Sequence, residues 1–190
     1  MQDQSNGWEA VAAHFIAERS SIGAATVRSW CKRLPPGSSV LDLGCGCGTP
    51  IADVLMEEGC LVYGIDASAS MIAAFRSRFP AATLACEPVE DSSFFGQTYD
   101  GVIAIGLLFL LPAELQRLLI RRVAAVLRPG GLFLFTAPLE VAQWQDCMMG
   151  GPCLSLGDQE YRHALREAGL SVIGEACDEG GNHYYQTCSQ

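Results

Sequence analysis

The sequence predicts an α/β fold: a doubly wound, mostly parallel sheet of seven strands with helices on both faces and a C-terminal antiparallel hairpin. From residue 39 onward, strand-like apolar runs alternate strictly with segments of helical periodicity. The strands are apolar almost throughout, which is typical of strands covered on both faces. With no internal repeat and no linker, the 190 residues are expected to form a single domain.

Two short helices are predicted before the sheet, over residues 7–17 and 21–33. In both segments apolar side chains, including Trp8, Phe15 and Trp30, recur at helical spacing. The run Pro-Pro-Gly at 35–37 then ends this section.

The sheet is expected to follow in two halves. The first half contains strands over 39–43, 60–66, 82–86 and 99–106 and helices over 50–58 and 68–79. The second half contains a helix over 112–127, a strand over 132–137, a loop over 138–157, a helix over 158–168, and strands over 170–177 and 183–188 that form the hairpin.

The most informative segment is Val-Leu-Asp-Leu-Gly-Cys-Gly-Cys-Gly at 40–48, an apolar strand that enters a glycine-rich turn. Such glycines let the backbone turn sharply and approach a ligand without a Cβ clash. Asp42 precedes the turn, and Asp66 ends the next strand roughly twenty residues on, where a carboxylate meets ribose hydroxyls in nucleotide-binding βαβ units. Ligands of such sheets bind at the carboxyl ends of the strands, so we expect an adenosyl cofactor here.

Other interpretations of the same residues stay open. Asp66 or Ser68 could simply cap the following helix. A dinucleotide-dependent oxidoreductase would share the first βαβ unit, although Thr49 follows the turn where its G-x-G-x-x-G pattern has the third glycine. A non-catalytic protein that binds an adenosyl cofactor would need the same turn and the same acids.

Composition and charge narrow the class of protein. The chain is 49% hydrophobic and 17% charged, which is ordinary for a compact soluble protein, and its net charge of -9 argues against nucleic acid as a partner. No apolar stretch reaches the roughly eighteen residues of a membrane helix, and the polar start does not resemble a signal peptide. We therefore expect a cytoplasmic protein without membrane contact, and we make no prediction of its oligomeric state.

The nine cysteines are interpreted as small hydrophobic side chains. They contain no C-x-x-C pair and lie mostly in apolar runs. No metal site is expected, because their spacing lacks the usual zinc pattern.

Four blocks of the chain resemble the class I S-adenosylmethionine-dependent methyltransferases. They are Val-Leu-Asp-Leu-Gly-Cys-Gly-Cys-Gly at 40–48, Val-Tyr-Gly-Ile-Asp-Ala-Ser at 62–68, Tyr-Asp-Gly-Val-Ile-Ala-Ile-Gly-Leu-Leu at 99–108, and Leu-Arg-Pro-Gly-Gly-Leu-Phe-Leu-Phe at 127–135. The two ends of the chain are similar to an uncharacterised bacterial branch of that family. The resemblance implies a Rossmann-like fold and methyl transfer from S-adenosyl-L-methionine, with S-adenosyl-L-homocysteine as the product.

The resemblance also implies roles for individual residues. Asp66 would bind the ribose hydroxyls, Asp42 would lie near the amino group of the cofactor, and Arg19 would pair with its carboxylate. Members of the family usually have an acidic residue beside the adenine at the position that Pro88 occupies here. We therefore expect the backbone at Val89 and Glu90 to contact the adenine instead. The full set of expected cofactor contacts is Arg19, Asp42, Gly44, Cys45, Gly46, Asp66, Ala67, Met71, Val89, Glu90 and Gly106.

By the same resemblance, residues 1–36 would form a helical lid, residues 37–138 the cofactor-binding core, and residues 139–190 the acceptor side. Lid residues over the acceptor are expected among Trp8, Phe15, Arg19, Trp144 and Asp146.

The chemistry needs a base only if the acceptor atom holds its proton, because the sulfonium already makes the methyl group electrophilic. Many relatives carry a histidine where this chain has Phe109. We therefore expect His183, next to Tyr184, as the catalytic pair. The aromatic and methionine-rich surroundings and the acidic surface favour a small acceptor, neutral or cationic.

Overall fold

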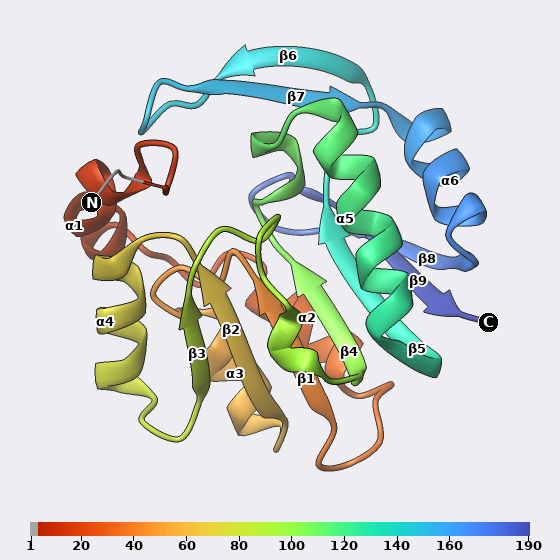
Figure 1. Cartoon of the computed structure of the whole chain (residues 1–190), viewed down its shortest axis with the longest axis horizontal. Coiled ribbons are helices and arrows are strands. Elements are labelled where there is room, and N and C mark those ends of the chain that lie inside the picture. The colour runs from red at the N-terminus through yellow and green to blue at the C-terminus, as the bar shows by residue number, and fades with distance from the viewer. Residues whose placement is uncertain (1–3) are drawn as a thin grey trace.

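Residues 4–190 are described by the structure, a computed structural model. Its centre is a seven-stranded sheet with the strand order β3-β2-β1-β4-β5-β9-β8 (Figure 1). The first five strands of the chain run parallel, β9 runs antiparallel to β5, and β8 runs antiparallel to β9. The strands are β1 (Ser39–Leu43), β2 (Leu61–Asp66), β3 (Thr83–Cys86), β4 (Tyr99–Ala104), β5 (Leu127–Thr136), β8 (Leu170–Cys177) and β9 (His183–Ser189).

Helices cover both faces of this sheet, which confirms the predicted fold class. Within residues 4–190 the α-helices are α1 (Trp8–Ala17), α2 (Ala24–Cys31), α3 (Ile51–Glu57), α4 (Ala69–Arg78), α5 (Ala113–Val126) and α6 (Asp158–Glu167). Short 3₁₀ turns lie at η1 (Phe94–Gly96) and η2 (Leu108–Leu110).

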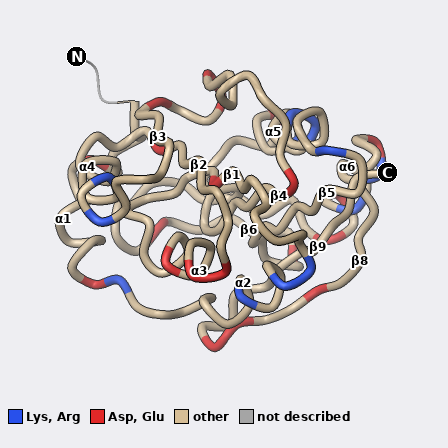
Figure 2. Tube along the Cα trace, turned by 90° about the horizontal axis from the view of Figure 1, so that it is seen from below, with Lys and Arg blue, Asp and Glu red and all other residues tan. Residues whose placement is uncertain are grey.

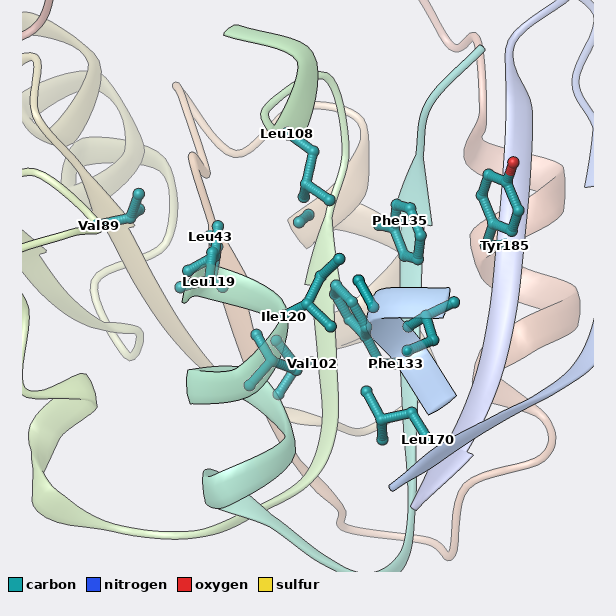
Figure 3. Packing of buried hydrophobic residues seen from close by; sticks show 14 of the residues in the cluster. Leu43, Val89, Val102, Leu108, Leu119, Ile120, Phe133, Phe135, Leu170 and Tyr185 are labelled. Carbon is teal, nitrogen blue, oxygen red and sulfur yellow. The ribbon is translucent and has the colours of Figure 1, made fainter. Parts of the chain in front are cut away.

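The alternation of side chains along each strand divides the core into two layers. Val40 packs with α2, α3 and α4 on one face, whereas Leu41 and Leu43 pack with α5 and α6 on the other. Figure 3 shows the second layer, where Leu119 and Ile120 of α5 lie over the central strands. All five residues of β1 are buried, which places the end of this strand deep in the molecule.

The structure corrects the expected elements at three places. β4 ends at Ala104, two residues earlier than expected, and β5 begins at Leu127 instead of residue 132. The early start of β5 is possible because the ladder between β4 and β5 has a register irregularity between Tyr99 and Gly101.

The third correction is the expected loop over 138–157, which contains a second, two-stranded sheet. Its strands are β6 (Val141–Gln145) and β7 (Pro152–Leu156), paired antiparallel. Figure 1 shows this β6–β7 hairpin as an arch above the carboxyl ends of the parallel strands, with its turn on the side of α1.

The surface carries more acid than base. Lys and Arg lie at separate positions along the chain trace, interspersed with Asp and Glu (Figure 2). Across residues 4–190, no helix has the length and apolar character needed to cross a bilayer.

Candidate functional site

A cavity of about 500 Å³ lies at the carboxyl ends of the parallel strands. All eleven residues expected to contact the cofactor line it, and so does Tyr184. Its walls come from the glycine turn after β1, the ends of β2, β4 and β5, the segment before α2, and the turn of the β6–β7 hairpin. The residues expected at one site are therefore brought together.

The glycine turn has the backbone conformation that the sequence predicts. Gly44 and Gly46 have φ angles of 67° and 53°, in the left-handed region that favours glycine. The N–H groups of Gly44 and Cys45 donate to the carbonyl of Ile65 over 2.9 and 3.0 Å, which ties the turn to the end of β2.

Asp66 is held at the end of β2 by two backbone groups. Its Oδ2 accepts the N–H of Gly46 at 2.9 Å, and its Oδ1 accepts the N–H of Ser68 at 2.8 Å. Burial raises the pKa of this carboxyl above its usual range, although both hydrogen bonds oppose the shift. Because each carboxylate oxygen accepts more than one hydrogen bond, the group keeps the capacity to bind hydroxyls from the cavity.

Asp42 is the least solvated acid of the cavity. Its side chain is 2% exposed, and within residues 4–190 its Oδ2 has no hydrogen-bond partner. Burial raises its pKa to about 8, the negative charge of Asp66 adds to the shift, and the positive charge of Arg19 opposes it. A buried acid with an unused oxygen on a cavity wall is suited to a cationic group or a hydrogen-bond donor.

Arg19 enters the cavity from the segment between α1 and α2. Its guanidinium lies over the ring of Phe15, 4.6 Å from the ring centroid, and its Nε donates to the carbonyl of Thr49 at 2.8 Å. Burial lowers the pKa of this group, against the attraction of Asp42. No hydrogen bond occupies its two terminal nitrogens in the part of the chain that is described, so they can bind an anion in the cavity.

The opposite end of the cavity is formed by Ala67, Met71 and the segment at residues 88–90. Arg122 of α5 fixes this segment: its Nη1 donates to the carbonyls of Val89 and Glu90, each over 2.8 Å, and its Nη2 donates to the carbonyl of Ser92. Arg122 was not expected from the sequence, because this contact joins elements that are far apart in the chain.

Tyr184 and His183 lie on opposite faces of β9. Tyr184 packs in the layer of α2 and α3, lines the cavity, and donates its hydroxyl to Asp178 Oδ2 at 2.9 Å. Burial raises the pKa of this phenol, and the bond to Asp178 adds to the shift.

His183 does not line the cavity. Its ring packs against Tyr185 at 4.8 Å between centroids, and its Nε2 lies 3.8 Å from Glu175 Oε2. Successive residues of a strand point to opposite faces, and Tyr184 is the member of the expected pair whose side chain lines the cavity. The structure therefore places His183 outside the cavity in which a base beside the acceptor was expected.

The expected lid residues fall into two groups. Trp8 and Phe15 of α1 line the cavity and pack edge to face, with ring centroids 5.5 Å apart, and Asp146 lines it from the hairpin turn. Trp144 does not line the cavity but packs against Phe109, which does, at 5.4 Å between centroids.

Several further lining residues were not expected from the sequence. They are Ser20, Leu107, Thr136, Met148, Met149, Asp178 and Asn182, among others. The sequence Ala-Gln-Trp-Gln at 142–145 alternates between apolar and polar residues, and this is the signal that could have revealed the hairpin that carries Met148 and Met149.

Across the described residues, no three His, Cys, Asp or Glu side chains are grouped as metal ligands, and the nine cysteines are free.

Comparison with known proteins agrees with this arrangement. Residues 40–131 match the methyltransferase domain family. An uncharacterised methyltransferase of Synechocystis sp. is 34% identical over 161 residues, which cover 78% of this chain and 74% of that protein. The ubiquinone biosynthesis O-methyltransferase of Coxiella burnetii is 28% identical over 163 residues, covering 78% and 68% of the two chains.

One solved structure with a similar fold is CalS10 with bound S-adenosylmethionine, an amino pentose methyltransferase from Micromonospora echinaspora. It matches with a TM-score of 0.74 at 18% identity, over 94% of this chain and 95% of that chain.

Proposed function

The chain belongs to the class I S-adenosylmethionine-dependent methyltransferases, and on this premise we propose that it methylates a small molecule bound in the cavity beside the cofactor. S-adenosylmethionine is its cofactor, and S-adenosylhomocysteine is the product. The observation that carries the proposal is the convergence of Asp42, Asp66 and Arg19 on one cavity at the glycine turn.

The amino-acid tail of the cofactor carries a positive amino group and a negative carboxylate, and each group needs a partner of the opposite charge. We propose that the buried Asp42 faces its amino group and that the free terminal nitrogens of Arg19 bind its carboxylate. Gly44, Cys45, Gly46 and Gly106 would leave room for the tail to pass close to the backbone.

Asp66 would accept the two ribose hydroxyls, since its oxygens already point to the turn and keep free capacity. Ala67 and Met71 would pack against the adenine. Because Arg122 occupies the carbonyls of Val89 and Glu90, the backbone N–H groups of these two residues are the groups available to the base.

A small acceptor is supported by the walls of the cavity. Beside the residues expected to contact the cofactor, its lining combines aromatic and aliphatic side chains with Asp146, Asp178 and several uncharged polar residues, and α1 and the β6–β7 hairpin contribute to its walls. The net charge of -9 and the scattered Lys and Arg of Figure 2 favour a neutral or cationic acceptor over nucleic acid. We place the reaction in the cytoplasm, with residues 1–36 as lid, 37–138 as cofactor core and 139–190 as acceptor side.

The cofactor supplies an electrophilic methyl group, so the protein's task is to align the acceptor and exclude water. We propose that Tyr184 contributes to this alignment: its hydroxyl proton is committed to Asp178, which leaves its oxygen lone pairs toward the cavity as acceptors for an N–H or O–H. No base from the protein is proposed.

Two measurements test the function. Calorimetry should detect binding of S-adenosylmethionine and S-adenosylhomocysteine, whereas NAD should give no heat; tight binding of NAD alone would overturn the assignment. Incubation with cofactor labelled in its methyl group and a metabolite extract should give a labelled small molecule, identified by mass. Cofactor binding without any labelled product would instead favour a non-catalytic binding protein.

A further inference from the structure

A single carboxylate joins α1 to the start of α4. Glu9 Oε2 accepts the hydroxyl of Ser68 at 2.5 Å and the N–H of Ser70 at 3.1 Å, and its Oε1 accepts the hydroxyl of Ser70 at 2.5 Å. An anion at this position also interacts favourably with the positive end of the α4 dipole. Glu9 is itself oriented within the first turn of α1, where its N–H donates to Ser5 Oγ at 2.8 Å.

These hydrogen bonds continue from Glu9 toward Asp66, the acid proposed to bind the ribose of the cofactor. Ser68 is fully buried and caps α4, since its Oγ accepts the N–H of Met71 at 3.2 Å. The N–H of Ser68 donates to Asp66 at 2.8 Å, and Asp66 in turn accepts the N–H of Gly46. Glu9 is thus connected through Ser68 to the residues proposed to bind the ribose, although it does not line the cavity itself.

The helix that Glu9 holds carries part of the cavity wall. Trp8 and Phe15 of α1 line the cavity, and Arg19 follows two residues after its end. The apolar contact of α1 centres on Ala12, its one buried residue, which packs against Cys47 and Met71, with Phe15 and Ile16 partly buried beside them. The hydrogen bonds of Glu9 add a polar contact between α1 and α4 to this attachment.

The tryptophan next to Glu9 gives an independent indication that this wall meets a ligand. Trp8 Nε1 is buried, and among the described residues it has no hydrogen-bond partner. A buried N–H without an acceptor costs free energy, and a ligand oxygen in the cavity would recover it. The wall that α1 contributes thus has a contact to α4 through Glu9 and an unsatisfied donor at Trp8.

We propose that Glu9 is a positioning residue that holds α1 over the bound cofactor and slows its release. The inference rests on the proposed cofactor site. Because Glu9 contacts Ser68 and Ser70 but not the cavity, it acts through Trp8, Phe15 and Arg19 rather than on the cofactor directly.

The test compares Glu9→Gln with Glu18→Gln in the full chain, using S-adenosylhomocysteine as the probe. Glu18 is the exposed C-cap residue of the same helix, so its substitution removes the same charge without touching α4. A glutamine at position 9 cannot accept all three hydrogen bonds, because its amide nitrogen is a donor. We expect Glu9→Gln to raise the dissociation rate of the probe roughly tenfold, the loss typical of hydrogen bonds to a charged group, while Glu18→Gln behaves as the wild type.

A double-mutant cycle separates the link between Glu9 and Ser70 from a general structural effect of the substitutions. Because Ser70 acts through Glu9, adding Ser70→Ala to Glu9→Gln should raise the dissociation rate little further. Equal dissociation rates for Glu9→Gln and Glu18→Gln would overturn the inference, and so would a loss of affinity that follows only a fall in melting temperature. Failure of the wild type to bind the probe would instead refute the proposed cofactor site.

Discussion

Asp42 should make cofactor binding depend on pH near neutrality. Its pKa of about 8 in the protein means that the carboxyl is mostly protonated at pH 7 before binding. If the cofactor's amino group binds the carboxylate form, the apparent dissociation constant equals the intrinsic one divided by the ionised fraction. That fraction rises from about 3% at pH 6.5 to about 76% at pH 8.5, so affinity should rise roughly 25-fold across this interval.

The assay is calorimetric titration with S-adenosylhomocysteine at several pH values, repeated in buffers of different ionisation enthalpy. Near pH 7 the wild type should release close to one proton on binding, because a cation beside Asp42 lowers its pKa. Asp42→Asn should bind weakly with little pH dependence and release no proton. Asp53→Asn, which removes a carboxylate that pairs with Arg78 on the surface, is the matched control and should behave as the wild type.

The same residue has a consequence for stability. Its pKa is higher in the folded than in the unfolded protein, so folding favours the protonated form and Asp42 makes the free energy of unfolding fall as pH rises from about 4 toward 8. Asp42→Asn should flatten this part of the profile. A wild-type affinity that does not change between pH 6.5 and 8.5, with no proton released, would refute the proposed role of Asp42.

Three further predictions concern the glycine turn and the two faces of β9. Asp66→Ala should weaken cofactor binding by roughly 1.5 to 3 kcal/mol, about ten- to a hundredfold, in a protein whose melting curve remains cooperative. An unchanged dissociation constant would show that Asp66 serves only to cap the helix that follows it. Gly46→Val should abolish binding, because valine is strained at a φ of 53° and its side chain enters the cavity wall, whereas Cys47→Ser should keep the affinity within about threefold; calorimetry on both variants checks the contrast. Tyr184→Phe should lower turnover roughly tenfold once the acceptor is known, while His183→Ala should keep it; the reverse order would show that His183 acts in catalysis.

The elements that the sequence predicted well are those with a strong local requirement. The central parallel strands β1 and β4 are buried on both faces, so each is largely an apolar run, and β1 is buried at all five residues. The turn after β1 needs glycine because its φ angles are positive, and the acids that flank it end strands. This is why the sequence could point to eleven residues that the structure brings together on one cavity.

The elements that escaped prediction have a weak signal in the local sequence, or none. The β6–β7 hairpin forms a separate two-stranded sheet, three of the five β6 residues are exposed, and its turn is stabilised by Asp146, which accepts the N–H groups of Met148 and Met149. The alternation that could have revealed it spans only residues 142–145. Arg122 reaches residues 89–92 because α5 packs beside them, and this contact between distant segments leaves no periodic pattern in the sequence.

The position of His183 outside the cavity is a different case and bears on the proposed reaction. The alternation of side chains along β9 could be read from the sequence and places His183 and Tyr184 on opposite faces. Which of the two side chains lines the cavity depends on α2, whose N-cap residue Gly23 lies against the Tyr184 hydroxyl. A Cβ on Gly23 would stand 2.4 Å from that hydroxyl, so a residue without a side chain is required for the tyrosine to reach this position. The group that we propose beside the acceptor is therefore a phenol whose pKa is raised and whose proton is held by Asp178, which makes it a poor base and a hydrogen-bond acceptor. A site of this kind favours alignment of an acceptor that arrives with its nucleophilic lone pair available.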